Sequence, residues 1–198
     1  MQVTFVEATR STCEPASLQY PSGTMIRLRT LLFVLIGSAM FPFASSAAPL
    51  AVGSAAPVVT GQTDAGTSLD LGSVYKSHPY TLVYFYPKAD TPGCTKQGCS
   101  LRDAYAELTG KGVAIIGVSA DSVESQRAFK EKYNLPFTLI ADKEMKVVTA
   151  FGAKSALLPM ASRQAYLIKD GKIVYADHKG STTKQAEDIL AFLAKSGS

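Results

Sequence analysis

The chain has 198 residues, a formal net charge of +4 at neutral pH and hydrophobic residues at 46% of its positions. These values are typical of one folded domain with an extension and exclude a largely disordered or fibrous protein. The charge is mild and no run of Lys and Arg occurs, which argues against nucleic acid as a partner.

The first 48 residues differ from the rest. A basic segment at 25–30 precedes an apolar run at 31–40 and small residues at 43–48. This pattern is typical of a secretory signal peptide. We therefore expect an over-extended start or disordered leader at 1–24, a signal peptide at 25–48 and the mature domain at 49–198. The expected location is the periplasm, with no stable membrane association after cleavage.

Other destinations stay open for this leader: a plastid or mitochondrial transit peptide, an uncleaved membrane anchor, or a cytoplasmic protein. The apolar run is short for a membrane span, which needs about 20 apolar residues. Its compact apolar core, together with Glu7 and Glu14, counts against a transit peptide. Removal of the leader also removes Cys13, so two cysteines remain, both within one short stretch of the mature chain. A secreted protein stapled by disulfides would spread them over its fold, so this concentration favours chemistry.

The central stretch of the sequence begins with an aromatic and β-branched segment at 80–86, which predicts a buried strand. Pro87 ends it. Thr91 is a suitable helix N-cap and Pro92 fits the first helical position. Cys94 would then lie in the first helical turn, where free backbone N–H groups and the helix dipole favour an anion. The anion that a cysteine provides is a thiolate, which is a nucleophile.

The next cysteine, Cys99, follows five residues later. On an ideal helix this spacing turns the two side chains about 140° apart and separates their Cα atoms by roughly 8–9 Å. A disulfide requires Cα atoms closer than about 7 Å. If Cys94 and Cys99 pair, the start of the helix must therefore unwind, which suits a catalytic disulfide better than a structural one.

The remaining mature chain alternates between strand and helix patterns. Apolar positions after Cys99 (Leu101, Ala104, Tyr105 and Leu108) continue the first helix. The pattern then predicts a strand at 112–119, a helix capped by Asp121 and ending near 133, a strand at 137–141, a helix at 144–151, a hairpin of 164–168 with 172–175, and a final helix around 186–193. This order predicts a three-layer α/β fold.

Two motifs carry a family resemblance. The run Pro87-x-x-x-Thr91-x-x-Cys94 resembles the active-site signature of the peroxiredoxins, and its wider context with Cys99 is similar to the bacterioferritin comigratory protein / peroxiredoxin Q branch. The segment from Arg163 to Ile168 resembles the arginine-bearing strand of that family. The resemblance covers nearly all of residues 50–195. It departs from the family pattern at Gln97, where Glu is common, and at Ala165, where Thr is common.

The resemblance implies an α/β, thioredoxin-like fold with a central mixed β-sheet flanked by helices. It implies a thiol peroxidase in which Cys94 attacks hydrogen peroxide or an organic hydroperoxide. Thr91 and Arg163 would align the peroxide, and Pro87 would shield the thiolate from water. Cys99 would resolve the oxidised Cys94 by forming a disulfide within the chain. The expected reductant is thioredoxin or a similar dithiol, and the expected oligomeric state is a monomer.

No cofactor is expected, because cysteine itself carries the chemistry. A metal site is not expected either, since two Cys and two His (His78 and His178) occur at a spacing that matches no zinc signature. Two alternatives remain. One is a thiol–disulfide oxidoreductase acting on proteins in the cell envelope, although that chemistry prefers C-x-x-C. The other is a non-enzymatic binding module whose disulfide is incidental.

Overall fold

A computed structural model describes residues 48–196 of the chain. Its centre is a mixed five-stranded sheet in the order β5-β4-β3-β6-β7. The two pairs β3–β4 and β4–β5 are parallel, whereas β3–β6 and β6–β7 are antiparallel. The strands are β3 (Tyr80–Phe85), β4 (Val113–Ser119), β5 (Thr138–Ala141), β6 (Gln164–Lys169) and β7 (Lys172–Asp177).

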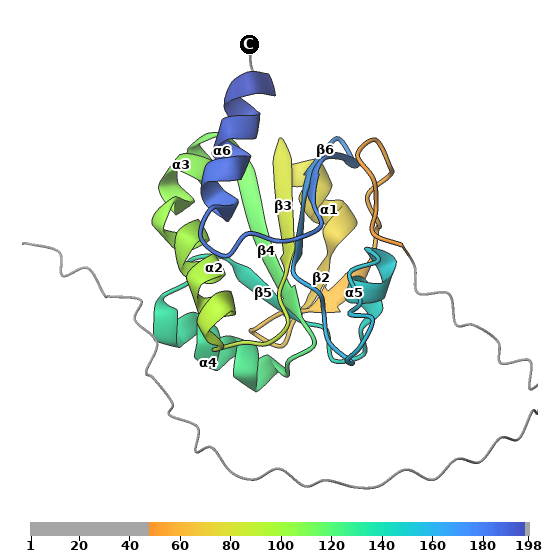
Figure 1. Cartoon of the computed structure of the whole chain (residues 1–198), viewed down its shortest axis with the longest axis vertical. Coiled ribbons are helices and arrows are strands. Elements are labelled where there is room, and N and C mark those ends of the chain that lie inside the picture. Colours follow the sequence, from red (N-terminus) through yellow and green to blue (C-terminus); the bar gives the residue numbers. More distant parts are fainter. Residues whose placement is uncertain (1–47, 197–198) are drawn as a thin grey trace, which may run out of the picture.

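Helices cover both faces of this sheet (Figure 1). The first face carries α2 (Pro92–Asp103), α3 (Tyr105–Gly110), α4 (Val123–Tyr133) and α6 (Gln185–Ser196), and the second carries α1 (Leu71–Ser77) and α5 (Lys146–Ala150). A short hairpin of β1 (Thr60–Gln62) and β2 (Ser68–Asp70) precedes α1.

The alternation of side chains along β3 explains the two layers. Successive residues of a strand point to opposite faces. Leu82 and Tyr84 accordingly join the core beneath α2, α4 and α6, whereas Val83 and Phe85 join the core beneath α1 and α5. A strand that is buried on both faces reads as a continuous apolar run, as 80–85 does.

The predicted alternation of strands and helices from residue 80 onward is confirmed, with three corrections. The helix after Cys94 is divided at Ala104, whose φ and ψ are −97° and 8°, into α2 and α3. The next helix is capped by Ser122 rather than by Asp121, because the Ser122 side chain accepts from the Ser125 N–H at 3.3 Å. The helix predicted at 144–151 begins only at Lys146, since Met145 has φ of +59°, which a right-handed helix excludes.

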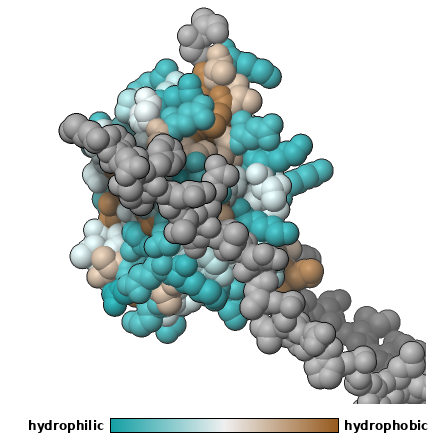
Figure 2. All heavy atoms as spheres, turned by 90° about the vertical axis from the view of Figure 1, so that its left-hand side faces the viewer, coloured by the Kyte–Doolittle hydropathy of each residue, from teal (hydrophilic) through white to brown (hydrophobic). Residues whose placement is uncertain are grey.

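Three elements were not predicted, namely the strands β1 and β2 of the short hairpin and the helix α1. Each of these strands has three residues, which is too short for an alternation pattern to be read. The predicted leader and signal peptide lie outside the described residues. Within residues 48–196, no helix is long and apolar enough to cross a membrane. On the side of α2 and α3, the described surface is mainly hydrophilic (Figure 2).

Candidate active site

The site lies where two antiparallel strands bring distant segments together. In the β3–β6 pair, Phe85 is opposite Gln164. The end of β3 therefore lies beside the start of β6. The chain leaves β3 toward α2 and Cys94, and it enters β6 directly after Arg163. Strand register thus places the predicted thiol and the predicted arginine at one edge of the sheet.

Cys94 lies in the first turn of α2, where its side chain is 2% exposed and its thiol is free. Arg163 Nη2 donates to Cys94 Sγ at 3.3 Å. No carboxylate of residues 48–196 forms an ion pair with Arg163. A cation beside a thiol favours its ionised, nucleophilic form, as does the start of a helix.

The approach of Arg163 to the helix depends on Gly93. A Cβ atom at Gly93 would lie 3.1 Å from Arg163 Nη2, which is a tight contact. The residue before the cysteine must therefore be very small if the guanidinium is to reach the sulfur. The segment Thr-Pro-Gly-Cys provides this clearance.

Thr91 and Pro87 lie in and beside the same helix start. Thr91 is the N-cap of α2 and Pro92 is in the first turn, as predicted. However, the Thr91 side chain does not cap the helix, because its hydroxyl donates to the Lys88 carbonyl at 3.0 Å. This bond uses the hydroxyl proton and leaves the oxygen able to accept. Pro87 lies two residues after the end of β3 and is half-buried.

Sequence reasoning missed a pair of buried amides behind Arg163. The Gln97 side-chain oxygen accepts from Arg163 Nη1, and its Nε2 donates to Gln185 Oε1. Both glutamines are completely buried. Gln97 was noted only as a departure from the family pattern. Its position one turn after Cys94 was the available signal, since residues three apart share a helix face.

Two tyrosines at the end of β3, one the penultimate residue of the strand and one directly after it, pack near the thiol, and they were also missed as site residues. Tyr84 and Tyr86 stack with ring centroids 5.5 Å apart, in the same buried cluster as Cys94. Burial raises the pKa of the Tyr84 hydroxyl well above its usual range; Tyr86 and Cys94 raise it further, and Arg163 opposes this rise. Tyr84 is therefore protonated at neutral pH and adds no negative charge beside the thiol.

The loop between β3 and α2 is held by a carboxylate from the segment that follows the neighbouring strand β4. The Asp121 side chain accepts from the buried Ala89 N–H at 2.7 Å and from Ser119 Oγ at 2.6 Å. Ser119 in turn accepts from Gln126 Nε2 at 2.6 Å. The carboxylate that was expected to cap a helix instead positions the loop that contains Pro87.

We expect Asp121→Ala to lower the free energy of unfolding by about 1–3 kcal/mol, because it leaves a buried N–H without an acceptor. Asp121→Asn keeps an oxygen at the same position and is the matched control. Urea unfolding of the two variants measures the difference. Equal stability of the alanine and asparagine variants would show that this hydrogen bond does not hold the loop.

Asp90, which precedes the helix, does not face the thiol with an unpaired charge. It adopts φ of +56°, and its carboxylate accepts from Lys132 Nζ at 2.7 Å and from the Tyr133 hydroxyl at 2.6 Å. Burial raises the pKa of Asp90, but the bonds to Lys132 and Tyr133 outweigh it and hold the pKa below its usual value. Asp90 therefore serves the geometry of the turn before the helix.

Cys99 lies on the same helix as Cys94 and is 4% exposed. Because Cys94 is a free thiol, the two cysteines are not bonded to each other in this structure. Both belong to the continuous helix α2, as the sequence predicted. Pairing between them therefore requires a local change of the helix.

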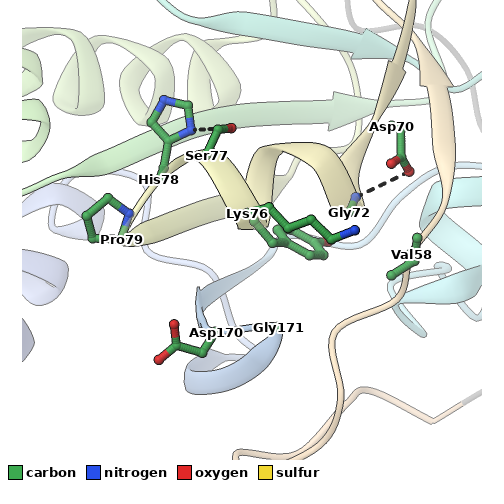
Figure 3. A pocket seen from close by; sticks show the side chains of 10 residues that line it. Val58, Asp70, Gly72, Lys76, Ser77, His78, Pro79, Asp170 and Gly171 are labelled. Carbon is green, nitrogen blue, oxygen red and sulfur yellow. Dashed lines mark hydrogen bonds between the residues drawn. The ribbon is translucent and has the colours of Figure 1, made fainter.

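No group of acidic, His or Cys side chains suited to a metal ion occurs within residues 48–196. His78 lies instead beside a cavity of about 630 Å³, which Figure 3 shows between α1 and the β6–β7 turn. Its Nδ1 lies 3.2 Å from Ser77 Oγ and 3.3 Å from the Val74 carbonyl. Pro79, the residue directly before β3, also lines the cavity. The cavity is therefore at the opposite end of β3 from Cys94.

Taken with the sheet, this geometry defines a cysteine-based redox enzyme on a thioredoxin-like fold. Residues 52–176 match the model of the AhpC/TSA family. The chain is 46% identical over 101 residues to a putative peroxiredoxin bcp of Coxiella burnetii, covering 51% of this chain and 66% of the relative. It is 38% identical over 154 residues to the chloroplastic peroxiredoxin Q of Suaeda salsa, and this match covers 76% of this chain and 71% of the relative.

A solved structure agrees with these relatives. The bacterioferritin comigratory protein of Xanthomonas campestris is 26% identical, with a TM-score of 0.67, over 73% of this chain and 100% of that chain. The chain therefore belongs to the AhpC/TSA family, as a peroxiredoxin of the peroxiredoxin Q / bacterioferritin comigratory protein branch. Peroxiredoxins are thiol-dependent peroxidases. The expected fold class is confirmed.

Proposed function

We propose that the chain reduces hydrogen peroxide and organic hydroperoxides through Cys94 and an intramolecular disulfide with Cys99. One observation carries this proposal: Arg163 Nη2 lies 3.3 Å from Cys94 Sγ without a carboxylate partner in the described part of the chain. The Xanthomonas relative has an alkyl peroxide reduction activity, which supports organic hydroperoxides among the substrates.

In the first step, the Cys94 thiolate attacks the nearer peroxide oxygen. A sulfur–oxygen bond forms while the O–O bond breaks, and the leaving oxygen takes a proton to become water or an alcohol. The sulfur is oxidised by two electrons to a sulfenic acid. A free thiol is only a few per cent ionised near pH 7, so complete ionisation accounts for roughly a thirtyfold gain.

A specialised peroxidase needs more than ionisation, and the neighbours of Cys94 supply groups that can bind both peroxide oxygens. Arg163 and the backbone N–H groups at the start of α2 are donors, and the Thr91 oxygen can accept because its proton is already used. Such donors stabilise the charge that develops as the O–O bond breaks. Pro87, beside this start, would limit access of water.

In the second step, the Cys99 thiolate attacks the sulfur of the Cys94 sulfenic acid. The S–S bond forms while the S–O bond breaks, and the leaving hydroxide takes up a proton to become water. Helical geometry keeps the Cα atoms roughly 8–9 Å apart, so the first turns of α2 must unwind for the sulfurs to meet. An external dithiol then reduces the disulfide by exchange. Thioredoxin is the proposed donor, and a monomer is the proposed working form.

We expect Cys99→Ser to consume one equivalent of peroxide at close to the wild-type rate and then to stop turning over with dithiothreitol-reduced thioredoxin as donor. Its Cys94 is oxidised but lacks its resolving partner. Stopped-flow oxidation followed by intact mass measures this, using reduced protein from residue 49 onward. Wild type should lose two hydrogens, whereas the variant should gain one oxygen.

The alternatives give different results in this experiment. A thiol–disulfide oxidoreductase would exchange with protein disulfides but oxidise with peroxide no faster than its unfolded form. A binding module would keep its disulfide and show no peroxide reaction. Either result would overturn the proposed function.

We further propose export directed by residues 25–48. The chloroplastic location named for the Suaeda relative keeps a plastid destination as the alternative. N-terminal sequencing of the protein purified from its own cells distinguishes the two, because cleavage near residue 48 in an envelope fraction would support export.

A further inference from the structure

The segment between β7 and α6 packs directly against Arg163. Its turn is held by Asp177, whose carboxylate accepts the backbone N–H groups of Lys179, Gly180 and Ser181 at 2.9–3.0 Å. A Cβ atom at Gly180 would lie 2.2 Å from Arg163 Cγ and 2.7 Å from the Arg163 backbone. This close packing places the segment that leads into α6 against Arg163, although this segment is far from Cys94 in the sequence.

Gln185, in the first turn of α6, ends a series of hydrogen-bonded groups that begins at the thiol. Arg163 donates through Nη2 to Cys94 and through Nη1 to Gln97, and Gln97 donates to Gln185 Oε1. A second contact lies one turn further along α2, where Ser100 Oγ donates to the carbonyl of Thr183, in the segment just before α6, at 3.1 Å. The C-terminal helix α6 is therefore linked to the Arg163 guanidinium through a single intervening side chain, that of Gln97.

The orientation of these amides is determined by their donors and acceptors. Arg163 can only donate, so the Gln97 oxygen must face it and the Gln97 nitrogen must face Gln185. Gln185 must then present its oxygen, and its own Nε2 is buried with no hydrogen-bond partner among residues 48–196. A buried unsatisfied amide is costly and unusual in a folded protein, so it calls for an explanation. Here the cost accompanies an acceptor that directs Gln97 toward Arg163.

The two side chains that hold Arg163, Gln97 and Gln185, carry no charge. Amides hold the guanidinium in place without neutralising it, so its positive charge remains available to the sulfur and to a peroxide. A carboxylate at position 97 would hold the same nitrogen but would compete with the thiolate for that charge. Position and charge are therefore supplied by different residues.

We propose that Gln185 is a positioning residue of this active site: by accepting from Gln97 it holds the Arg163 guanidinium against Cys94. This inference rests on the proposed peroxidase function and extends it to α6. Gln185 does not touch the sulfur, so its effect passes through Gln97 and Arg163.

The test compares two reactions of reduced Cys94 in a Cys99→Ser background, namely with hydrogen peroxide and with iodoacetamide. Peroxide needs the aligned guanidinium, whereas alkylation needs only an accessible thiolate. The ratio of the two second-order rates therefore reports alignment. We expect Gln185→Met, which keeps the volume but removes the acceptor, to lower this ratio about tenfold.

Ile189→Ala is the matched control. Ile189 is a completely buried residue one turn further along α6, and its loss destabilises the same helix without touching the amides. Its ratio should equal that of the parent. Gln185→Glu retains an oxygen that can accept from Gln97 and should restore the ratio to within about threefold. An equal ratio in Gln185→Met and Ile189→Ala, or an equal loss in the Glu and Met variants, would overturn the proposal.

A double variant tests the route of the effect. If Gln185 acts through Gln97, adding Gln185→Met to Gln97→Met should not lower the ratio further. Additive losses would instead indicate a general structural role. This comparison also uses Gln97→Met alone, which remains informative if the single Gln185 variant folds poorly.

The parent protein separates failure of this inference from failure of the proposed function. A parent that reacts with peroxide no faster than its unfolded form refutes the peroxidase. The guanidinium signals of Arg163 in NMR need no peroxide and judge the inference separately. They should be narrow in the parent and in Ile189→Ala, and broadened in Gln185→Met.

Discussion

Replacement of Cys94 by serine is expected to abolish peroxide reduction, leaving only the rate of the buffer. An alcohol is essentially not ionised at neutral pH, and no His or carboxylate in the described part of the chain is hydrogen-bonded to position 94 to act as a base. The measurement is consumption of hydrogen peroxide with excess dithiothreitol as reductant. The loss should exceed about a thousandfold, because the covalent route is removed entirely rather than slowed.

Cys99→Ser serves as the control for this loss. It also removes one thiol from α2, yet it should retain the first oxidation step. Circular dichroism of both variants checks that the helix persists, since a serine hydroxyl replaces sulfur with little change in volume. Peroxide consumption by Cys94→Ser at a rate near that of wild type would refute Cys94 as the nucleophile.

The second large effect concerns Arg163. We expect Arg163→Met to slow oxidation of Cys94 by about 10²–10³-fold, the usual cost of removing one donor that stabilises developing charge. The variant keeps a long side chain against Gly180 but removes the donors that reach Cys94 Sγ and the Gln97 oxygen. Stopped-flow oxidation under single-turnover conditions isolates this step from disulfide reduction.

Arg163→Lys distinguishes charge from geometry. Lysine restores the positive charge but presents one ammonium group in place of the planar fork that contacts sulfur and amide together. We expect a rate between those of Arg163→Met and wild type. If lysine restored the full rate, charge alone would suffice and the two-pronged contact would be unimportant. If the methionine variant oxidised as fast as wild type, Arg163 would have no part in the reaction.

Local signals in the sequence were sufficient for much of the fold. The buried strand at 80–85, Pro92 in the first helical turn and Cys94 just after it follow from neighbouring residues, because strand propensity and capping act over a few positions. The hairpin of β6 and β7 was predicted from Asp170-Gly171, both of which adopt positive φ. Each of these features is decided within one turn or one strand.

Local signals were wrong or silent where tertiary contacts compete with them. Asp121 is a residue type that often caps helices. Its carboxylate instead accepts a hydrogen bond from the Ala89 N–H, in a distant segment, and Ser122 caps α4. The break at Ala104 carries no Gly or Pro to predict it. A pattern of apolar residues predicts which face of a helix is buried. It does not predict which hydrogen bonds or helix breaks the packing of a distant segment will cause.

Neighbouring residues were enough to predict a thiol at the start of a helix after a buried strand, since both features depend on adjacent positions. The groups that surround this thiol could not be predicted in that way, because they come from distant parts of the chain. Arg163 is 69 residues from Cys94, and Gln185 is 88 residues from Gln97. Antiparallel pairing of β3 with β6 and packing of α6 on α2 bring these groups together. Hydrogen bonds between side chains depend on distance in space. The number of residues between two side chains does not specify this distance, because the strands do not lie in the sheet in the order in which they occur in the sequence.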